Sequence, residues 1–146
     1  MSVSGEVATG DMERLKANLA ARAKSLELLY DYTKFHIGVY LTLSASYITV
    51  TTVKIPGHAS TDHLLAVNHC WMAFAVAFFL LAGLAAGIIV SSITQYAEGG
   101  SAEFLETEIG PWNAKLIHLR ARYWTYIEHT SFWAGLLAAI GSILWR

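Results

Sequence analysis

The sequence predicts an all-α fold: a polytopic helical membrane protein in which residues 1–146 form one membrane domain with three transmembrane helices. Hydrophobic residues make up 55% of the chain and charged residues only 14%. Residues 35–53, 64–97 and 129–145 contain no Asp, Glu, Lys or Arg, so all 21 such residues lie elsewhere. A soluble helix needs a charged face along its length, and the longest of these uncharged runs, 34 residues, does not provide one.

The overall charge and the absence of known motifs exclude several functions. A net charge of −1 gives no electrostatic case for nucleic acid as a partner. Cys70 is the only cysteine, so it can form neither a disulfide within the chain nor a CxxC site. We expect no enzymatic activity, because the sequence contains no phosphate-binding loop, HExxH motif or nucleophile elbow. Eight charged residues among the first 30 argue against a cleavable secretory signal.

The first predicted helix begins at Asp11, which can serve as its cap, and it has two parts. Residues 11–34 form an amphipathic cytoplasmic segment that continues into the first span, residues 35–54. Gly38 is the only glycine between residues 11 and 53, and no proline occurs there. We therefore expect one continuous helix, roughly 60–65 Å long at 1.5 Å per residue. Its apolar residues recur at helical spacing: Met12, Leu15, Leu19, Ala23, Leu26 and Leu29.

The second predicted span covers residues 64–97 and follows a short turn that contains Pro56. Thr61 or Asp62 is the expected helix cap. A helix of this length exceeds a hydrocarbon core of ~30 Å, so it must tilt or protrude from the bilayer.

The predicted cytoplasmic connection, residues 98–122, leads into the third span, residues 123–145. Within it, residues 101–109 form a short acidic amphipathic segment. Gly110 and Pro111 are expected to open the last helix, because proline suits the first turn.

The basic residues predict the orientation of the chain. The amino-terminal flank and the 98–122 connection together hold eight of them, whereas the 54–63 turn and the carboxyl end hold one each. Since basic residues favour cytoplasmic loops, we expect a cytoplasmic amino terminus and an extracytoplasmic carboxyl terminus.

The first predicted span is rich in hydroxyl groups, which occur on eight of its 19 uncharged residues. Five of its polar residues fall on one helical stripe. Such a stripe should face another helix or water, because lipid offers no hydrogen bonds. It can serve as interhelical packing or as the lining of a wet groove or pore. The stripe consists of His36, Tyr40, Ser44, Tyr47 and Thr51.

Two small-residue faces predict close helix packing in the membrane. One is a GxxxG motif in the second span, extended by a serine, and the other has the same four-residue interval in the third span. Small residues let helix backbones approach closely, within one chain or between copies. Because three helices bury little surface on their own, we expect a homo-oligomer or a subunit of a larger complex. The two faces are Gly83, Gly87, Ser91 and Ser131, Gly135, Ala139.

Ionisable residues should lie inside the membrane near its cytoplasmic side. Glu128 and His129 are about one turn inside the aromatic residues that begin the third span, and His36 is at similar depth. Such residues are rare and often functional. Glu128 can pair with Lys34 or His36 and set the helix register. A proton-linked gate is a second interpretation, and a b-type haem held by His36 and His129 is a third.

A second group of histidines gathers on the outer side. Imidazoles and a carboxylate can bind zinc or copper, but this spacing is not a recognised ligand pattern. Solvated side chains are the favoured interpretation, and we expect no metal. The group is His58, Asp62, His63 and His69.

The sequence favours a non-enzymatic integral membrane protein that self-associates and acts as a channel-like protein or membrane effector. Its expected partners are the lipid bilayer, further copies or other membrane subunits, and no cofactor is expected. The alternative is a membrane anchor or accessory subunit, with haem b for electron transfer as one form.

One architectural resemblance accompanies this interpretation. A basic helix over residues 14–34 that leads into a membrane hairpin, residues 35–97, resembles the small pore-forming effectors of bacterial defence systems. The third span departs from that architecture, and no functional residue is transferred.

Overall fold

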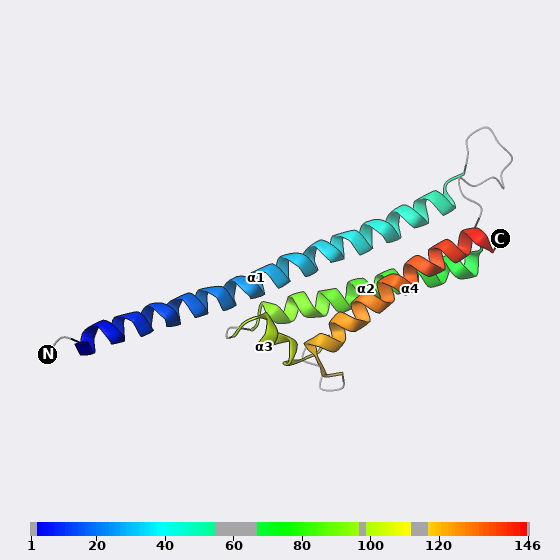
Figure 1. Ribbon diagram of the computed structural model, residues 1–146. Coiled ribbons are helices and arrows are strands. Elements are labelled where there is room, and N and C mark those ends of the chain that lie inside the picture. Colours follow the sequence, from blue (N-terminus) through cyan, green and yellow to red (C-terminus); the bar gives the residue numbers. More distant parts are fainter. Residues whose placement is uncertain (1–2, 55–66, 97–98, 112–116, 146) are drawn as a thin grey trace.

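The protein folds into a long helix beside an antiparallel helical pair (Figure 1). The computed structural model describes residues 3–54, 67–96, 99–111 and 117–145. Apart from one pair of two-residue strands the fold is all-helical, as predicted. Its elements in chain order are α1 (Val3–Thr52), α2 (His69–Ile93), α3 (Ser101–Leu105), β1 (Glu108–Ile109), β2 (Leu119–Arg120) and α4 (Ala121–Leu144).

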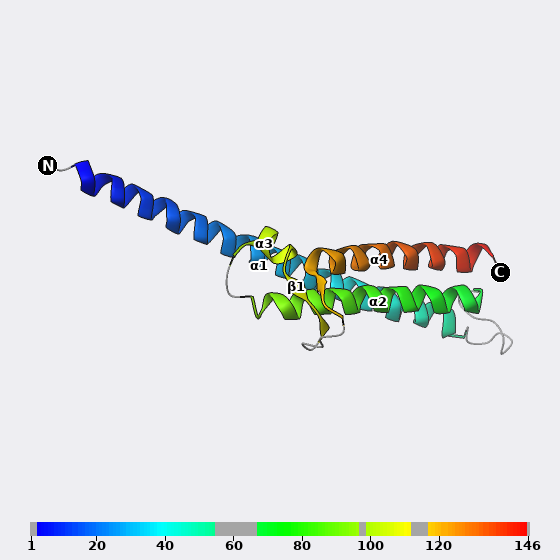
Figure 2. The same cartoon turned by 90° about the horizontal axis from the view of Figure 1, so that it is seen from below.

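Helix α1 is one unbroken element of 50 residues, about 75 Å long at 1.5 Å per residue. Asp11 is not its first residue, because the helix already begins at Val3. The two views show its amino-terminal half projecting beyond the other helices, while its second half runs beside α2 and α4 (Figures 1 and 2). The predicted segments 11–34 and 35–54 therefore belong to one rod, which ends at Thr52.

Helix α2 is shorter than the predicted span 64–97. Asn68 is its amino-terminal cap: its side chain accepts hydrogen bonds from the backbone N–H groups of Cys70 and Trp71. The Asn68 backbone N–H donates to the Ser142 carbonyl at 2.9 Å, which fixes this end of α2 to α4. The predicted caps, Thr61 and Asp62, lie outside the described residues. With 25 residues, α2 is about 37 Å long and matches one bilayer crossing without an overlong segment.

The connection after α2 turns tightly against α1. Gly99 has φ 90°, and a Cβ there would lie 2.8 Å from the Tyr96 hydroxyl, so only glycine fits. Glu103 accepts a hydrogen bond from the Gly100 N–H at 3.0 Å and lies 3.3 Å from the Arg22 guanidinium. Hydrogen bonds from its own backbone N–H and from Gly100 hold the pKa of Glu103 below its usual value. Ser25 of α1 accepts from the Ser101 N–H, so α3 is tied to the helix rod.

The prediction that Gly110 and Pro111 open the last helix is wrong. The chain instead forms an antiparallel strand pair in which Glu108 lies opposite Arg120. A Cβ on Gly110 would lie 2.5 Å from the Ile117 carbonyl oxygen, so the returning chain crosses where only glycine leaves room. Helix α4 begins afterwards, at Ala121, whose N–H donates to the Thr107 carbonyl at 2.9 Å.

The core lies along α2, which contacts both α1 and α4. Near the connection, Phe104 and Trp124 are buried against Ala85, and the Trp124 indole N–H donates to the Ile109 carbonyl at 3.1 Å. Further along the bundle Phe79 packs with Ala138. Small residues on α2 thus let the helices approach closely.

Helices α2 and α4 are long and apolar enough to cross a membrane. Helix α1 is less hydrophobic on average, because its second half carries the hydroxyl-rich stripe and its first half is charged. Large apolar side chains lie exposed on each of the three long helices α1, α2 and α4, among them Leu41, Leu84 and Leu137. Large exposed apolar surface is rare in soluble monomers and normal in a bilayer.

Candidate functional site

The candidate site is a polar seam between α1 and α4, which we define as His36, Tyr40 and Tyr47 of α1 with Glu128 and Ser142 of α4. These helices meet mainly through long side chains, whereas each of them packs closely on α2. The side chains of the seam therefore fill the space between α1 and α4, whose backbones do not pack closely on each other.

The carboxyl group of Glu128 is the centre of the seam. His36 Nδ1 lies 2.9 Å from its Oε1 atom, and the Tyr40 hydroxyl donates to the same atom at 2.9 Å. Tyr40 also lies 3.3 Å from His36 Nδ1, so the three groups form a closed triangle. Because Tyr40 is one turn after His36 on α1, one face of a single helix supplies both partners of Glu128.

Glu128 is almost fully buried, with an exposed fraction of 1%. Both hydrogen bonds reach Oε1, and among the described residues no group bonds to Oε2. A buried carboxyl group is costly unless it is paired and hydrogen-bonded, so His36 and Tyr40 hold a group that the apolar bundle would otherwise exclude. The second oxygen of the carboxyl group is therefore available to a further hydrogen-bond donor.

The other predicted ionisable residues lie nearby in different roles. His129 Nδ1 lies 2.9 Å from the Thr125 carbonyl oxygen, and the His129 ring centroid is 5.9 Å from that of His36. Lys34 lies over the Tyr30 ring at 5.9 Å. Of the two proposed partners of Glu128, His36 makes the contact and Lys34 does not.

The rest of the predicted polar stripe also faces into the bundle. Ser44 and Thr51 are buried, and their hydroxyls donate to carbonyl groups one turn earlier on α1. The Tyr47 hydroxyl bonds to the Ser142 hydroxyl of α4. Phe132 of α4 packs on the Tyr40 ring, with centroids 5.4 Å apart, and separates the Glu128 end of the seam from the Tyr47 end. Within the described residues, the stripe thus bonds to α4 and to carbonyl groups of its own helix.

Sequence reasoning missed Ser142 and Phe132. A signal for Ser142 was present, because it follows Glu128 by 14 residues, close to four helical turns, and so lies on the same face of α4. Phe132, one turn after Glu128, carried no comparable signal, since phenylalanine fits a lipid-facing position equally well.

The two small-residue faces lie in opposite environments. Gly135 is buried, and a Cβ on it would lie 2.8 Å from the Phe79 ring of α2. Ser131 is buried on the same helix and Ala139 is partly buried. On α2, a Cβ on Gly83 or Gly87 would meet no atom within 4 Å, and Ser91 is exposed.

The outer histidine group is described only in part. His58, Asp62 and His63 lie outside the described residues, and His69 is exposed at the first residue of α2. Within the described ranges, no three His, Cys, Asp or Glu side chains are placed to hold a metal ion together.

Comparison of the chain with protein-family models, with curated proteins and with solved structures gave no match.

Proposed function

We propose that the chain is an integral membrane protein with three spans that assembles with further copies in the bilayer and has no enzymatic activity. In this proposal the second half of α1 is the additional span, together with α2 and α4. The amino-terminal half of α1 and the 98–122 connection lie in the cytoplasm, and the carboxyl terminus lies outside.

The side-chain directions of α1 support its role as a span. Its hydroxyl stripe is buried or hydrogen-bonded within the bundle, while Leu41, Ile48 and Val50 are exposed where lipid would lie. The exposed Thr49 and Thr52 donate to carbonyl groups of their own helix, at 2.8 and 2.7 Å. These hydroxyls therefore need no water, which is the condition for a polar helix to cross hydrocarbon.

The open GxxxG face of α2 is the observation that carries the self-association. Gly83 and Gly87 have unoccupied space where a side chain would be, although the same helix packs closely on its other faces. In a membrane such a face lets a second helix approach backbone to backbone. If the assembly is channel-like, its permeation path would lie between copies, because the polar stripe of each chain is hydrogen-bonded within that chain.

Gly83→Leu and Gly87→Leu should convert the assembly to monomers. Each added side chain blocks close approach of a second copy, and neither meets an atom of its own chain within 4 Å of the Cβ. We expect the dissociation constant in mild detergent to rise at least about tenfold, which corresponds to about 1.4 kcal/mol. Sedimentation of the labelled protein at several detergent ratios measures it.

Gly38→Leu is the matched control, because Gly38 on α1 also has no atom within 4 Å of its Cβ position. It should leave the oligomer intact. A wild-type protein that is monomeric at every detergent ratio would contradict self-association, as would equal effects of all three substitutions.

A second candidate is a membrane anchor subunit for electron transfer, supported by the histidine pair. His36 and His129 each have Nδ1 engaged, by Glu128 and by the Thr125 carbonyl, and their Nε2 atoms make no hydrogen bond to a described residue. Metal-bound histidines are commonly oriented by such bonds. A reduced-minus-oxidised visible spectrum of freshly purified protein, expressed with haem supplied, decides between the two: a Soret band favours this candidate and its absence removes it.

A further inference from the structure

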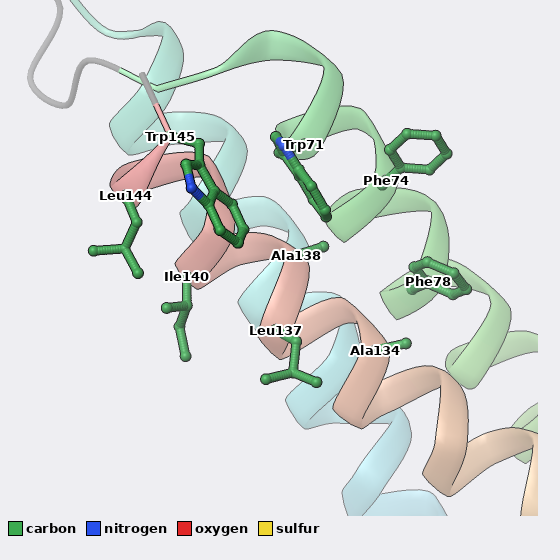
Figure 3. A pocket seen from close by; sticks show the side chains of 10 residues that line it. Trp71, Phe74, Phe78, Ala134, Leu137, Ala138, Ile140, Leu144 and Trp145 are labelled. Atoms are coloured by element: carbon green, nitrogen blue, oxygen red, sulfur yellow. The ribbon is translucent and has the colours of Figure 1, made fainter.

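The outer half of the α2–α4 pair carries an apolar groove with a volume of about 650 Å³ (Figure 3). Phe74 and Phe78 of α2 form one wall, and Leu137 and Ile140 of α4 form the other. Ala134 and Ala138 point from α4 toward α2 and leave the floor low between them. The groove thus has large side chains as its walls and small side chains as its floor.

The length of the groove corresponds to one leaflet of a bilayer. Its lining residues on α4 extend from Ala134 to Trp145, which is about 16 Å along the helix at 1.5 Å per residue. Half of a hydrocarbon core of ~30 Å is about the same. A helix from a second copy would cross both leaflets and would need a groove that continues past Ala134, where α4 instead exposes Trp133 and Tyr126.

One end of the groove, at the start of α2 and the end of α4, is suited to the polar part of a lipid. Trp71 and Trp145 lie there with ring centroids 5.6 Å apart, and tryptophan favours the depth of lipid headgroups. Neither indole N–H has an acceptor among the described residues, so both can donate to a lipid ester or phosphate oxygen.

We propose that this groove binds one acyl chain of a phospholipid from the extracytoplasmic leaflet, with the indole N–H groups of Trp71 and Trp145 on its polar end. The inference rests on the proposed membrane insertion. It adds a defined lipid site to a protein whose self-association face, on Gly83 and Gly87, uses other residues of α2.

Ala134→Leu tests the site by filling the floor of the groove. The protein is purified in mild detergent that contains phosphatidylcholine and measured by native mass spectrometry. We expect the wild type to keep one phosphatidylcholine per chain and Ala134→Leu to lose it. Ala73→Leu is the control: it makes the same change at an exposed position of α2 that does not line the groove, and it should keep the lipid.

Three outcomes would overturn the proposal. Equal lipid retention in both variants would mean that the lipid binds elsewhere. A lipid-free wild-type dimer that Ala134→Leu converts to monomer would mean that a second copy occupies the groove. Wild-type protein that stays dissolved without detergent would overturn the membrane proposal itself, a failure distinct from loss of lipid alone.

A further variant keeps the test decisive if Ala134→Leu does not fold. Leu137→Ala lowers an exposed wall of the groove without adding volume to the bundle. It should reduce the retained lipid while the circular dichroism of the protein stays that of the wild type. Retention equal to that of the wild type would count against the site.

Discussion

Glu128→Ala should destabilise the helical bundle by about 3 kcal/mol, because it removes the group through which His36 and Tyr40 of α1 are hydrogen-bonded to α4. The substitution removes the shared acceptor of His36 and Tyr40, which lie 2.9 Å from the same oxygen atom. A buried group that loses its partner costs ~1–3 kcal/mol, His36 and Tyr40 would keep only their mutual contact at 3.3 Å, and the lost side chain also leaves a cavity. Unfolding of the purified protein by dodecyl sulfate in mixed micelles measures the difference.

Glu128→Gln is the matched control for this prediction. Its amide oxygen can still accept from Tyr40 and the shape of the side chain is kept, so we expect a loss of about 1 kcal/mol, the value of one hydrogen bond. If Glu128→Ala unfolded at the same dodecyl sulfate fraction as the wild type, the carboxyl group would not hold α1 to α4.

Gly135→Leu should separate α2 from α4 and cost about 1–3 kcal/mol or more, the usual range for overpacking a core. A Cβ at this position would lie 2.8 and 2.9 Å from two atoms of the Phe79 ring and 3.3 Å from the Ala75 carbonyl oxygen. Phe79 is itself buried, so its ring has little room to move away. The same dodecyl sulfate titration, followed by the loss of helical circular dichroism, measures the effect.

Gly87→Leu gives the comparison on α2. It makes the same change at a glycine with open space and should leave the unfolding of the single chain unchanged while it weakens assembly. Equal destabilisation by Gly135→Leu and Gly87→Leu would contradict the assignment of an inner and an outer small-residue face.

The distribution of charge predicted the helices, but it did not predict their ends. The uncharged runs 64–97 and 129–145 contain all of α2 and most of α4, because burial in lipid or protein disfavours charged side chains along a helix. The start of α2 at His69 depends instead on Asn68, which bonds to α4 as well as to its own helix. Such a tertiary contact leaves no periodic trace in the sequence.

The candidate site was predictable in its members but not in all its contacts. Helical spacing placed His36 and Tyr40 on one stripe, and both reach Glu128. Lys34 is two residues before His36 and therefore points away from that stripe, since residues two apart do not share a helix face. The same limit applies to the glycines: the spacing identifies a small face, but neighbouring helices decide whether it is covered, as at Gly135, or open, as at Gly83.

The connection between α2 and α4 was predicted incorrectly because two segments of the chain come close together there. By residue type, Gly110 and Pro111 are suited to the start of a helix. In the structure, however, glycine is needed at position 110 because the chain reverses direction and Ile117 comes close to it. Residue preferences describe one segment at a time, so they do not predict that a later strand will pair with that segment.

The crossing of the membrane by α1 is the central claim, and labelling from outside the cell tests it most directly. Native Cys70 is exposed near the start of α2, at the end of the bundle that the proposal places outside the cell, and Ala21 is exposed on the amino-terminal half of α1. Cells producing the wild type, or Cys70→Ser with Ala21→Cys, are treated with a membrane-impermeant maleimide before and after lysis. We expect Cys70 to be labelled in intact cells and the cysteine at position 21 only after lysis. Labelling of both cysteines from the same side would show that α1 does not cross the bilayer.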